Sequence, residues 1–440
     1  MRFFRLFIIS SLLFASSVSA QFQSLAPEAL MPGLREVIDV ALKESEDMQL
    51  RELSEGIVKG RRIASSSAVL PSFTTNFSLR QEEDQGVRKE LGFQERAVYN
   101  IRFRQPLYHW GAKQAEKQIG KTTYQAELLS TEYAKQQLVR EIRRGYMNLV
   151  VQRQELEMRR QALELTKQEL TFLREQKEAG TASSAQVGSK ELDLERAELV
   201  YLRESYQWDD QISRFATLVG MEPERIESLL IEEIPEIEAV ETEMVQALTS
   251  QFDAAVAADE TVRRSALDIE VAEKRLKIER TSLKPKIDVE LGMSSNALDS
   301  DGTRREQEYV FFGLSVGWNI FDGFRTKGDK MARSYELSRA EYQLNSRVRS
   351  LLLGYEKQLR EVELARRALE IEERVLTMNE GFLKRLVEEI ERKNASQSEY
   401  DEFEQKYLAA KIRAQRARAT YLDTLGYLLM QLKVDSISER

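Results

Sequence analysis

Two nine-residue stretches, QPLYHWGAK at residues 105–113 and WNIFDGFRT at residues 318–326, decide how this sequence of 440 residues folds. Each follows a segment of alternating polarity, and each precedes a long helical pattern. They align at a shift of 213 residues, which sets Leu107 against Ile320 and Tyr108 against Phe321. The same shift aligns the TAS of residues 181–183 with the NAS of residues 394–396. The chain therefore contains two copies of one repeat, and such a duplication governs every later assignment.

A seven-residue apolar series follows the first stretch and returns after the second. Its members are Ile142, Leu149, Leu156, Leu163 and Leu170, and then, 213 residues later, Tyr355, Val362, Leu369, Leu376 and Leu383. A sustained seven-residue period is typical of helices that pack lengthwise as a coiled coil. An ordinary amphipathic helix is the alternative interpretation. Only 7 prolines and 20 glycines in 440 residues, with 31% charged residues, favour long solvated helices.

Each repeat is predicted to run helix, strand, strand and helical hairpin. Repeat 1 covers residues 21–220, with a first helix from about Leu34 to Ala68 and a hairpin over about 112–219 that turns at 178–184. Repeat 2 covers 250–432, with a first helix from about Ala254 to Leu283 and a hairpin over about 325–432 that turns at 393–397. Residues 221–249 are predicted as an equatorial linker and 433–440 as a tail, in which residues 435–440 are expected to be frayed. At ~1.5 Å per residue, a helix of about 66 residues is on the order of 100 Å long, which no compact domain needs.

Four segments whose polarity alternates with a period of two are predicted as strands, at about 71–82, 97–108, 285–296 and 308–321. In the fourth, one face carries only apolar residues: Val310, Phe312, Leu314, Val316, Trp318 and Ile320. A tilted strand of about 9 to 11 residues crosses a bilayer, and apolar-out, polar-in alternation is typical of outer-membrane barrels. A soluble hairpin with one buried face is the alternative. We favour the membrane because the flanking helices are polar and paired with one another, which leaves nothing else to cover the apolar faces.

Four strands cannot close a barrel by themselves, because lipid tolerates no unpaired edge and the smallest barrels have about eight strands. The chain is therefore expected to assemble around an axis. Aromatic residues near the strand ends are candidates either for interfacial girdles or for a core. They are Tyr99, Tyr108, Trp110, Tyr309, Trp318 and Phe321.

The first twenty residues are predicted to be a cleaved secretory signal peptide, because Arg2 and Arg5 precede an apolar run that small residues up to Ala20 follow. After residue 20 no apolar stretch reaches the roughly 18 residues that a spanning helix needs. The remainder carries 63 basic and 73 acidic residues, which argues against nucleic acid as a partner. With no cysteine and one histidine, we expect no disulfide, no lipid anchor on a terminal thiol, no cofactor and no transition-metal site.

These features resemble the TolC family of outer-membrane efflux and secretion ducts. The resemblance covers nearly all of the chain after residue 20 and rests on the order of several motifs. The motifs are the strand entry Leu70-Pro71-Ser72, the strand-to-helix turns with Gly111, Asp322 and Gly323, and the hairpin tip from Ala179 to Ser183. The resemblance implies a mainly α-helical fold with a membrane β-barrel portion. In it a homotrimer shares a 12-stranded barrel that continues as a long α-helical barrel.

The resemblance implies a passive, gated exit duct of a tripartite efflux pump or a type I secretion system. Its partners would be outer-membrane lipid, a periplasmic adaptor (membrane fusion) protein and an inner-membrane pump of the RND, ABC or MFS type, which supplies the energy. The implied location is the outer membrane of a Gram-negative bacterium, with the helices in the periplasm. No enzyme activity is expected, because the sequence shows no nucleophile with a base, no paired phosphate loop and no metal-ligand spacing. The cargo is not indicated.

In the family, the hairpin tips dock against the adaptor. By resemblance the first tip comprises Gly180, Thr181, Ala182 and Ser183, and the second comprises Asn394, Ala395 and Ser396. Lys393 stands where the family often has glycine. Gly180 also has a structural use, because a tight turn between helices often needs a positive φ.

Glu399 and Glu402 match acidic residues with which some family members narrow the periplasmic entrance. A spacing of three puts both carboxylates on one helix face. Three chains would bring six carboxylates to a ring that favours cations. A solvated helix surface is the alternative, because the whole stretch is acidic, with Glu388, Glu389, Glu391, Asp401 and Glu404.

Arg80, Arg102 and Arg104 fall on the polar sides of the first two strands and are predicted to face a lumen. An arginine paired with an acid across strands would serve structure instead. His109 lies over Asp322 of the other repeat and is interpreted as a helix-start residue rather than a ligand or base. A periplasmic adaptor and a structural coiled-coil envelope protein are the alternative identities. Two hairpins and four amphipathic strands argue against both.

Overall fold

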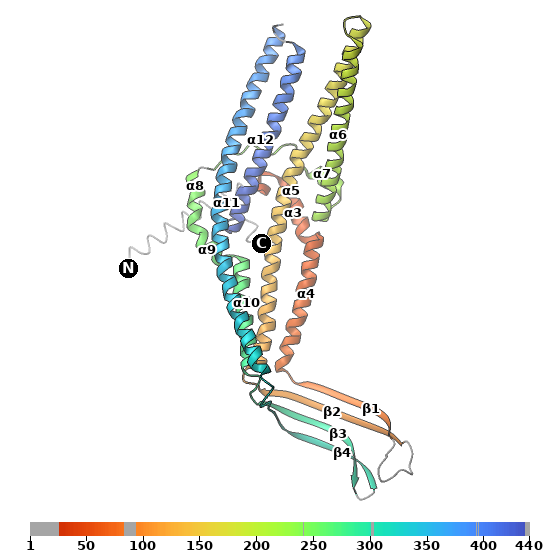
Figure 1. The fold of residues 1–440 in the computed structure, drawn as a ribbon, viewed down its shortest axis with the longest axis vertical. Helices are drawn as coiled ribbons and strands as arrows, with labels where there is room; N and C mark the ends of the chain where they lie inside the picture. The colour runs from red at the N-terminus through yellow and green to blue at the C-terminus, as the bar shows by residue number, and fades with distance from the viewer. Residues whose placement is uncertain are drawn as a thin grey trace, which may run out of the picture. The chain divides into compact units, whose positions relative to one another are not determined.

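The computed structural model describes residues 26–82, 94–240, 242–300, 303–392, 394 and 396–435. The predicted signal peptide, the loop at 83–93, Lys393, Ala395 and the end of the tail from 436 onward lie outside this part of the chain. The elements, drawn in Figure 1, are α2 (Pro27–Leu30), α3 (Pro32–Glu44), α4 (Glu46–Ser66), η1 (Ser67–Val69), β1 (Ser72–Glu82), β2 (Gln94–Tyr108), α5 (Ala112–Glu178), α6 (Ser184–Val219), α7 (Pro223–Leu229), α8 (Thr242–Ala247), η3 (Leu248–Gln251), α9 (Phe252–Ala258), α10 (Glu260–Arg280), β3 (Lys286–Ser300), β4 (Thr303–Gly317), α11 (Arg325–Glu391) and α12 (Gln397–Gln431).

The two hairpins repeat each other closely. α5 and α11 contain 67 residues each and begin 213 positions apart, at Ala112 and Arg325. The return helices α6 and α12 also begin 213 positions apart, at Ser184 and Gln397. The four helices contain no proline and are rich in Ala, Leu, Glu, Lys, Arg and Gln, which lose little freedom in a helix. Among the described residues, no helix is both long enough and apolar enough to cross a membrane.

The chain forms two compact units, and each unit takes segments from both repeats. The first comprises Met1–Glu52, Thr131–Asp259 and Val348–Arg440, and the second comprises Leu53–Ser130 and Glu260–Arg347. In the sequence, the two repeats follow one another and are separated by the linker. The compact units mix the repeats because strands of both pair in one sheet and helices of both enclose one core.

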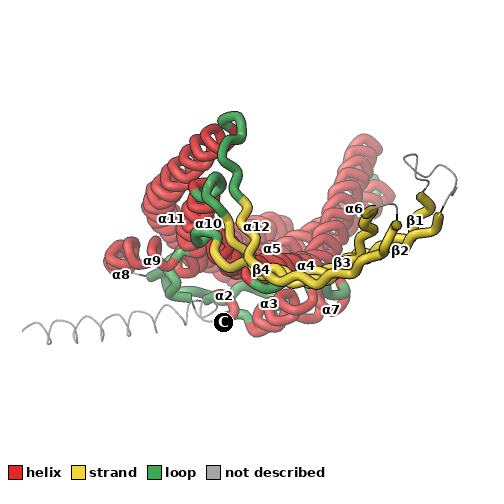
Figure 2. Tube along the Cα trace, turned by 90° about the horizontal axis from the view of Figure 1, so that it is seen from below, coloured by secondary structure: helices red, strands yellow, loops and turns green. Residues whose placement is uncertain are grey.

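The second unit contains a single antiparallel sheet with the strand order β1-β2-β3-β4 (Figure 2). β2 and β3 join the two repeats, and their ladder pairs Ile101 with Met293 and Phe103 with Leu291. β1 and β4 are the edges, and within the described chain neither has a second strand partner. The sheet therefore presents two different unpaired edges.

The registers bring the apolar residues of all four strands to one face of the sheet. Directly opposed residues of antiparallel strands point to the same side. The positions on this face are Phe73, Thr75, Phe77, Leu79, Tyr99, Ile101, Phe103, Ile287, Val289, Leu291, Met293, Val310, Phe312, Leu314 and Val316. Phe77 is 72% exposed and Phe312 is 78% exposed, so no described element covers this face.

β4 ends earlier than predicted, at Gly317 rather than near residue 321. Gly317 pairs with Lys286, and the residue before Lys286 is Pro285, which has no N–H to extend the ladder. A second irregularity lies at the end of β2, where the register with β3 shifts between Pro106 and Tyr108. Proline is accommodated in a sheet at such a bulge.

The first helix of each repeat is interrupted, which corrects the prediction of single helices over 34–68 and 254–283. α3 ends at Glu44 and α4 begins at Glu46, while α9 ends at Ala258 and α10 begins at Glu260. The intervening residues, Ser45 and Asp259, are of the types that cap helix N-termini. Ser45 Oγ accepts the Met48 N–H at 3.4 Å.

The core of the first unit lies where the hairpins meet α3 and the linker. Its largest buried side chains include Ile142, Tyr146 and Phe215. The predicted apolar series contributes Ile142 and Leu149 to this core. Further members of the series are buried elsewhere along the hairpins: Leu163 on α5, and Tyr355 and Val362 on α11. The series is therefore an internal seam of each hairpin.

The tail is packed at its start, which corrects the prediction that it is frayed from residue 435. Asp435 is buried, and its Oδ2 lies 2.6 Å from the Arg143 guanidinium on α5. Arg143 also forms a bidentate pair with Glu28 of α2, at 2.6 and 3.0 Å. One buried arginine therefore holds segments from both ends of the described chain, because two carboxylates compensate the cost of burying its charge.

Candidate functional site

The first hairpin tip is a tightly hydrogen-bonded turn with exposed side chains. Gly180 has φ of +80°, and the amide of Thr181 donates to the Gln176 carbonyl at 2.8 Å. Ser183 Oγ accepts the Gln186 N–H at 3.2 Å, and Gln186 Oε1 accepts the Ser183 N–H at 2.8 Å. This reciprocal capping box starts α6. The turn leaves Gly180 with no atom near its would-be side chain, so its outer surface is open.

The second tip repeats this construction. The amide of Asn394 donates to the Glu389 carbonyl at 2.9 Å, and Ser396 forms a capping box with Glu399 at the start of α12. Glu399 Oε2 accepts the Ser396 N–H at 2.8 Å. The two tips therefore share a Ser-x-x-Gln/Glu pattern that our reading of the sequence missed. Ala395, the middle residue of the three predicted for the second tip, lies outside the described chain.

Both predicted gate carboxylates have partners in their own helix. The Ser396 N–H lowers the pKa of Glu399, with a further contribution from the Ser396 hydroxyl. Glu402 Oε1 lies 2.7 Å from Lys406 Nζ, and the Glu402 side chain is 71% exposed. Glu399 thus has a capping role that does not depend on a gate. Both carboxylates nevertheless stay exposed at the beginning of α12.

The three strand arginines have different surroundings. Arg104 donates to Asp288 Oδ2 at 2.5 and 3.1 Å and lies 3.5 Å from Glu290, so it is paired across β2 and β3. Arg102 lies opposite Thr74 and Gly292 on the polar face, and it forms no ion pair with an acid of the described residues. The side chain of Arg80 lies outside the described part of the chain. Arg104 therefore has the structural role expected of an arginine that is paired with an acid across strands. Arg102 remains the candidate for a cation that faces the lumen.

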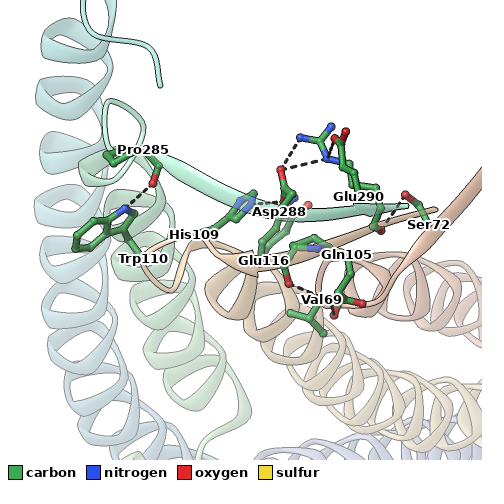
Figure 3. A network of polar contacts seen from close by, with 12 residues as sticks. Val69, Ser72, Gln105, His109, Trp110, Glu116, Pro285, Asp288 and Glu290 are labelled. Atoms are coloured by element: carbon green, nitrogen blue, oxygen red, sulfur yellow. Dashed lines mark hydrogen bonds and ion pairs between the residues drawn. The ribbon is translucent and has the colours of Figure 1, made fainter. Parts of the chain in front are cut away.

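His109 belongs to a polar network that fixes the strand-to-helix turn of repeat 1 (Figure 3). Its Nε2 lies 2.7 Å from Asp288 Oδ1, and the Asp288 side chain is only 3% exposed. The Trp110 indole N–H donates to the Pro285 carbonyl at 2.8 Å. His109 is therefore bound to a strand of the other repeat rather than acting only as a helix-start residue. Sequence gave no signal for this contact, because it depends on the pairing of β2 with β3.

The two turns share an unusual backbone conformation. Trp110 and Gly111 have φ of +55° and +80°, and at the equivalent positions Gly323 and Phe324 have φ of +66° and +68°. Glycine adopts such angles without a steric cost, which explains Gly111 and Gly323. Asp322 Oδ2 accepts the N–H and hydroxyl of Thr326 at 3.0 and 2.5 Å. The bond from the hydroxyl is the main cause of the lowered pKa of Asp322.

Residues 230–240, here called the equatorial link, run without helix or strand across α5 and α12 in the first unit. α5 holds the beginning of the link. The Tyr146 hydroxyl donates to the Leu229 carbonyl at 2.7 Å and accepts the Ile231 N–H at 3.2 Å, while Arg153 donates to the Ile231 carbonyl at 2.6 Å. These side chains take the place of a strand partner for the extended backbone.

α12 holds the rest of the link through residues three positions apart on one face. Gln415 Oε1 accepts the Ile234 N–H at 2.7 Å, Arg418 donates to the Ile234 carbonyl at 3.0 Å, and the Tyr421 hydroxyl accepts the Val240 N–H at 2.9 Å. Arg418 also forms a bidentate pair with Glu373 of α11, at 2.5 and 3.0 Å. The link therefore joins the long helix of repeat 1 to the hairpin of repeat 2.

A polar cavity of about 360 Å³ lies between α5, α6 and α12. Its lining includes Arg144, Gln152 and Asp423. Burial raises the pKa of Asp423, although the guanidinium groups of Arg140, Arg144 and Arg143 oppose this effect. A charged carboxylate at this position is therefore costly.

The comparisons with known proteins identify the family. The family model described as outer membrane efflux protein matches residues 37–221 and 252–425, which include the first hairpin, all four strands and the second hairpin as far as residue 425. The chain belongs to the outer membrane efflux protein family. It is therefore an outer-membrane efflux channel protein and not an enzyme, which confirms the resemblance to the TolC family. The rival identities, an adaptor and a structural coiled-coil protein, do not fit this family.

Solved channels have the same fold. The chain is similar to VceC of Vibrio cholerae, with 15% identity over 91% of this chain and 95% of that one, at a TM-score of 0.68. It is similar to the CmeC outer membrane channel of Campylobacter jejuni, with 13% identity over 91% and 86%, at 0.70. It is similar to the MtrE outer membrane channel of Neisseria gonorrhoeae, solved in its open state, with 15% identity over 94% and 93%, at 0.66. A search of curated protein sequences found no match.

Proposed function

We propose that three copies of this chain form a gated duct through the outer membrane, which works with a periplasmic adaptor and an inner-membrane pump. The observation that carries the proposal is the four-stranded sheet with one exposed apolar face and two open edges. Such a sheet is compatible with lipid only when each edge is paired. Joining β1 of one copy to β4 of the next pairs every edge, and three copies give twelve strands.

The helices of the first unit support the same arrangement. α6 and α11 lie on opposite sides of α5 and α12, which contact each other through the ion pair of Arg416 with Glu155 (Figure 1). Each flanking helix exposes apolar residues seven positions apart. They are Leu192, Leu199 and Tyr206 on α6, and Leu364, Ile371 and Met378 on α11. Because the two flanks differ, a contact between them is head to tail, and repeated contacts of this kind close a ring.

The oligomer is tested by the native mass of the protein extracted from outer membranes in detergent. The chain of 440 residues, with the predicted signal peptide, has a mass of 50.9 kDa, and the expected particle contains three copies of the chain without that peptide. Leu199→Lys should reduce the trimer fraction, whereas Phe172→Lys, at an exposed apolar residue of α5 outside the two flanks, should not. A soluble monomer from wild type would contradict the proposal. The same preparation tests signal cleavage after Ala20 and the absence of a lipid, by intact mass.

The proposed adaptor contacts are the turn at residues 180–183 and, in the second tip, the exposed residues Asn394 and Ser396, with Ala395 between them as the sequence predicts. Their capping boxes hold the backbone while the outer atoms stay free, which suits docking against another helical hairpin. The pump type and the cargo follow from the partner and not from this chain.

Glu399 and Glu402 are the proposed acidic gate. Single-channel conductance in planar bilayers tests it, with the double variant Glu399→Gln/Glu402→Gln compared with wild type. Gln186 already forms the equivalent cap in repeat 1, so glutamine at 399 removes charge and keeps the cap. We expect weaker cation selectivity and weaker block by divalent cations. Glu404→Gln, one turn away, is the matched control, and an equal effect there would refute the ring.

A further inference from the structure

The two strand-to-helix turns each keep a large aromatic residue in a left-handed conformation. Trp110 has φ of +55° beside Gly111, and Phe324 has φ of +68° beside Gly323. The glycine occupies the second position in one turn and the first position in the other. A bulky side chain at such an angle is costly and persists where something compensates for it. Both turns carry this cost, although at different positions.

Within the described part of the chain, the Phe324 ring is not buried by its neighbours. Its side chain is 69% exposed, and its one aromatic neighbour, Phe321, is 69% exposed as well. Trp318, next to the end of β4, is 60% exposed. Its indole N–H donates to the Leu283 carbonyl at 3.0 Å, which fixes the ring without burying it. The rings of Phe321, Phe324 and Trp318 are therefore largely exposed.

Two lysines accompany these rings. Lys284 Nζ lies 4.5 Å from the centre of the Trp110 ring, and Lys327 Nζ lies 5.9 Å from the centre of the Phe324 ring. Within the described chain neither ammonium forms an ion pair. The nearby Asp322 carboxylate is occupied by Thr326. The surface thus combines exposed aromatic rings with cations that lack a local counter-charge.

We propose that this surface, the turn belt of Trp110, Lys284, Trp318, Phe324 and Lys327, binds the headgroups of anionic phospholipids in the leaflet next to the helices. The proposal rests on the outer-membrane function above and names a lipid partner for it. Aromatic rings with a polar edge favour the membrane interface, and lysines near the surface are attracted to anionic lipid. Zwitterionic lipid can contact the aromatic rings, but it offers the lysines no net negative charge.

Tryptophan fluorescence tests the proposal directly. The sequence has three tryptophans, and Trp208, in the first unit, is the buried one at 8% exposure. Trp208→Phe leaves Trp110 and Trp318 as reporters within the turn belt. The trimer is reconstituted into vesicles of brominated phosphatidylglycerol or brominated phosphatidylethanolamine, and quenching is compared. We expect stronger quenching by the anionic lipid in mixtures, and an advantage that shrinks as salt screens the lysines.

Lys284→Gln/Lys327→Gln should reduce the preference for anionic lipid, by roughly fivefold at most for each lysine removed. Lys384→Gln/Lys135→Gln changes the net charge equally at exposed positions of the first unit and should leave the preference unchanged. Equal quenching by both lipids, or a preference that survives in the Lys284/Lys327 variant, overturns the proposal while leaving the membrane location intact. Absence of quenching by either lipid overturns the membrane location as well.

Discussion

Replacing Arg418 by methionine should weaken the first unit at the point where α11, α12 and the equatorial link meet. The Arg418 side chain is 4% exposed, and it loses a bidentate pair with Glu373 and a bond to the Ile234 carbonyl. The pair contributes roughly 1.5–3 kcal/mol, and the orphaned carbonyl costs about 1 kcal/mol. The Glu373 side chain is 30% exposed and regains water, so the total stays below that of a fully buried pair. We expect a loss of about 3 kcal/mol in the free energy of unfolding.

The assay is guanidinium unfolding of the detergent-solubilised protein, with a double-mutant cycle of Arg418→Met and Glu373→Gln. The two losses should not add, because each removes the same pair. Arg413→Met is the matched control: it lies on the same helix, and its guanidinium is 3.4 Å from Glu372 of α11 with the arginine 52% exposed. We expect it to cost less than about 1 kcal/mol. Equal losses for Arg413→Met and Arg418→Met, or strict additivity in the cycle, would refute the reasoning.

Three further outcomes are expected. Gly323→Ala should lower the free energy of unfolding by about 1–2 kcal/mol, because alanine at the positive φ of this residue is strained. Gly328→Ala, inside α11 with open space around it, should raise the free energy of unfolding by up to about 1 kcal/mol. Equal shifts of the two variants in urea unfolding would contradict this difference. Glu399→Ala should speed amide hydrogen exchange in the first turn of α12, and Glu399→Gln should not. Asp423→Asn should stabilise the protein at neutral pH, because the buried Asp423 carboxyl has a raised pKa in the native state and its charged form destabilises the fold. The gain should disappear below the usual aspartate pKa, where the carboxyl is protonated in both the native and the unfolded state. Thermal unfolding measured across pH checks the sign.

Sequence alone predicted those parts of the fold that depend on local periodicity. The period of seven located the seams at Ile142 and Tyr355, and the period of two placed Phe77 and Phe312 on strand faces that the structure leaves uncovered. The shift of 213 residues predicted where the second long helix and its return helix begin. Hydrogen-bonding residues mark some boundaries as well, since Ser396 and Glu399 form a capping box that can be recognised by spacing.

Contacts between residues far apart in the chain could not be predicted this way. Asp288 binds His109 and Arg104 across 179 and 184 residues, and nothing periodic links these positions. Asp435 belongs to a polar ending whose composition indicates fraying, and its ion pair with Arg143 could not be read from that composition. The equatorial link was predicted as part of a linker. The side chains that bind its backbone, such as Gln415, lie within helices, and the helical pattern does not predict that they bind a backbone group.

The unpaired edges of the sheet also bear on the genetics of the protein. In the ring that we propose, a chain that enters through β1 but whose β4 cannot pair with the next copy would also prevent its wild-type neighbours from closing the ring. A variant with β4 disrupted, for example by proline on that strand, should therefore act dominantly when it is made beside the wild type. Loss of the whole chain should behave as recessive, because the remaining wild-type copies still find one another.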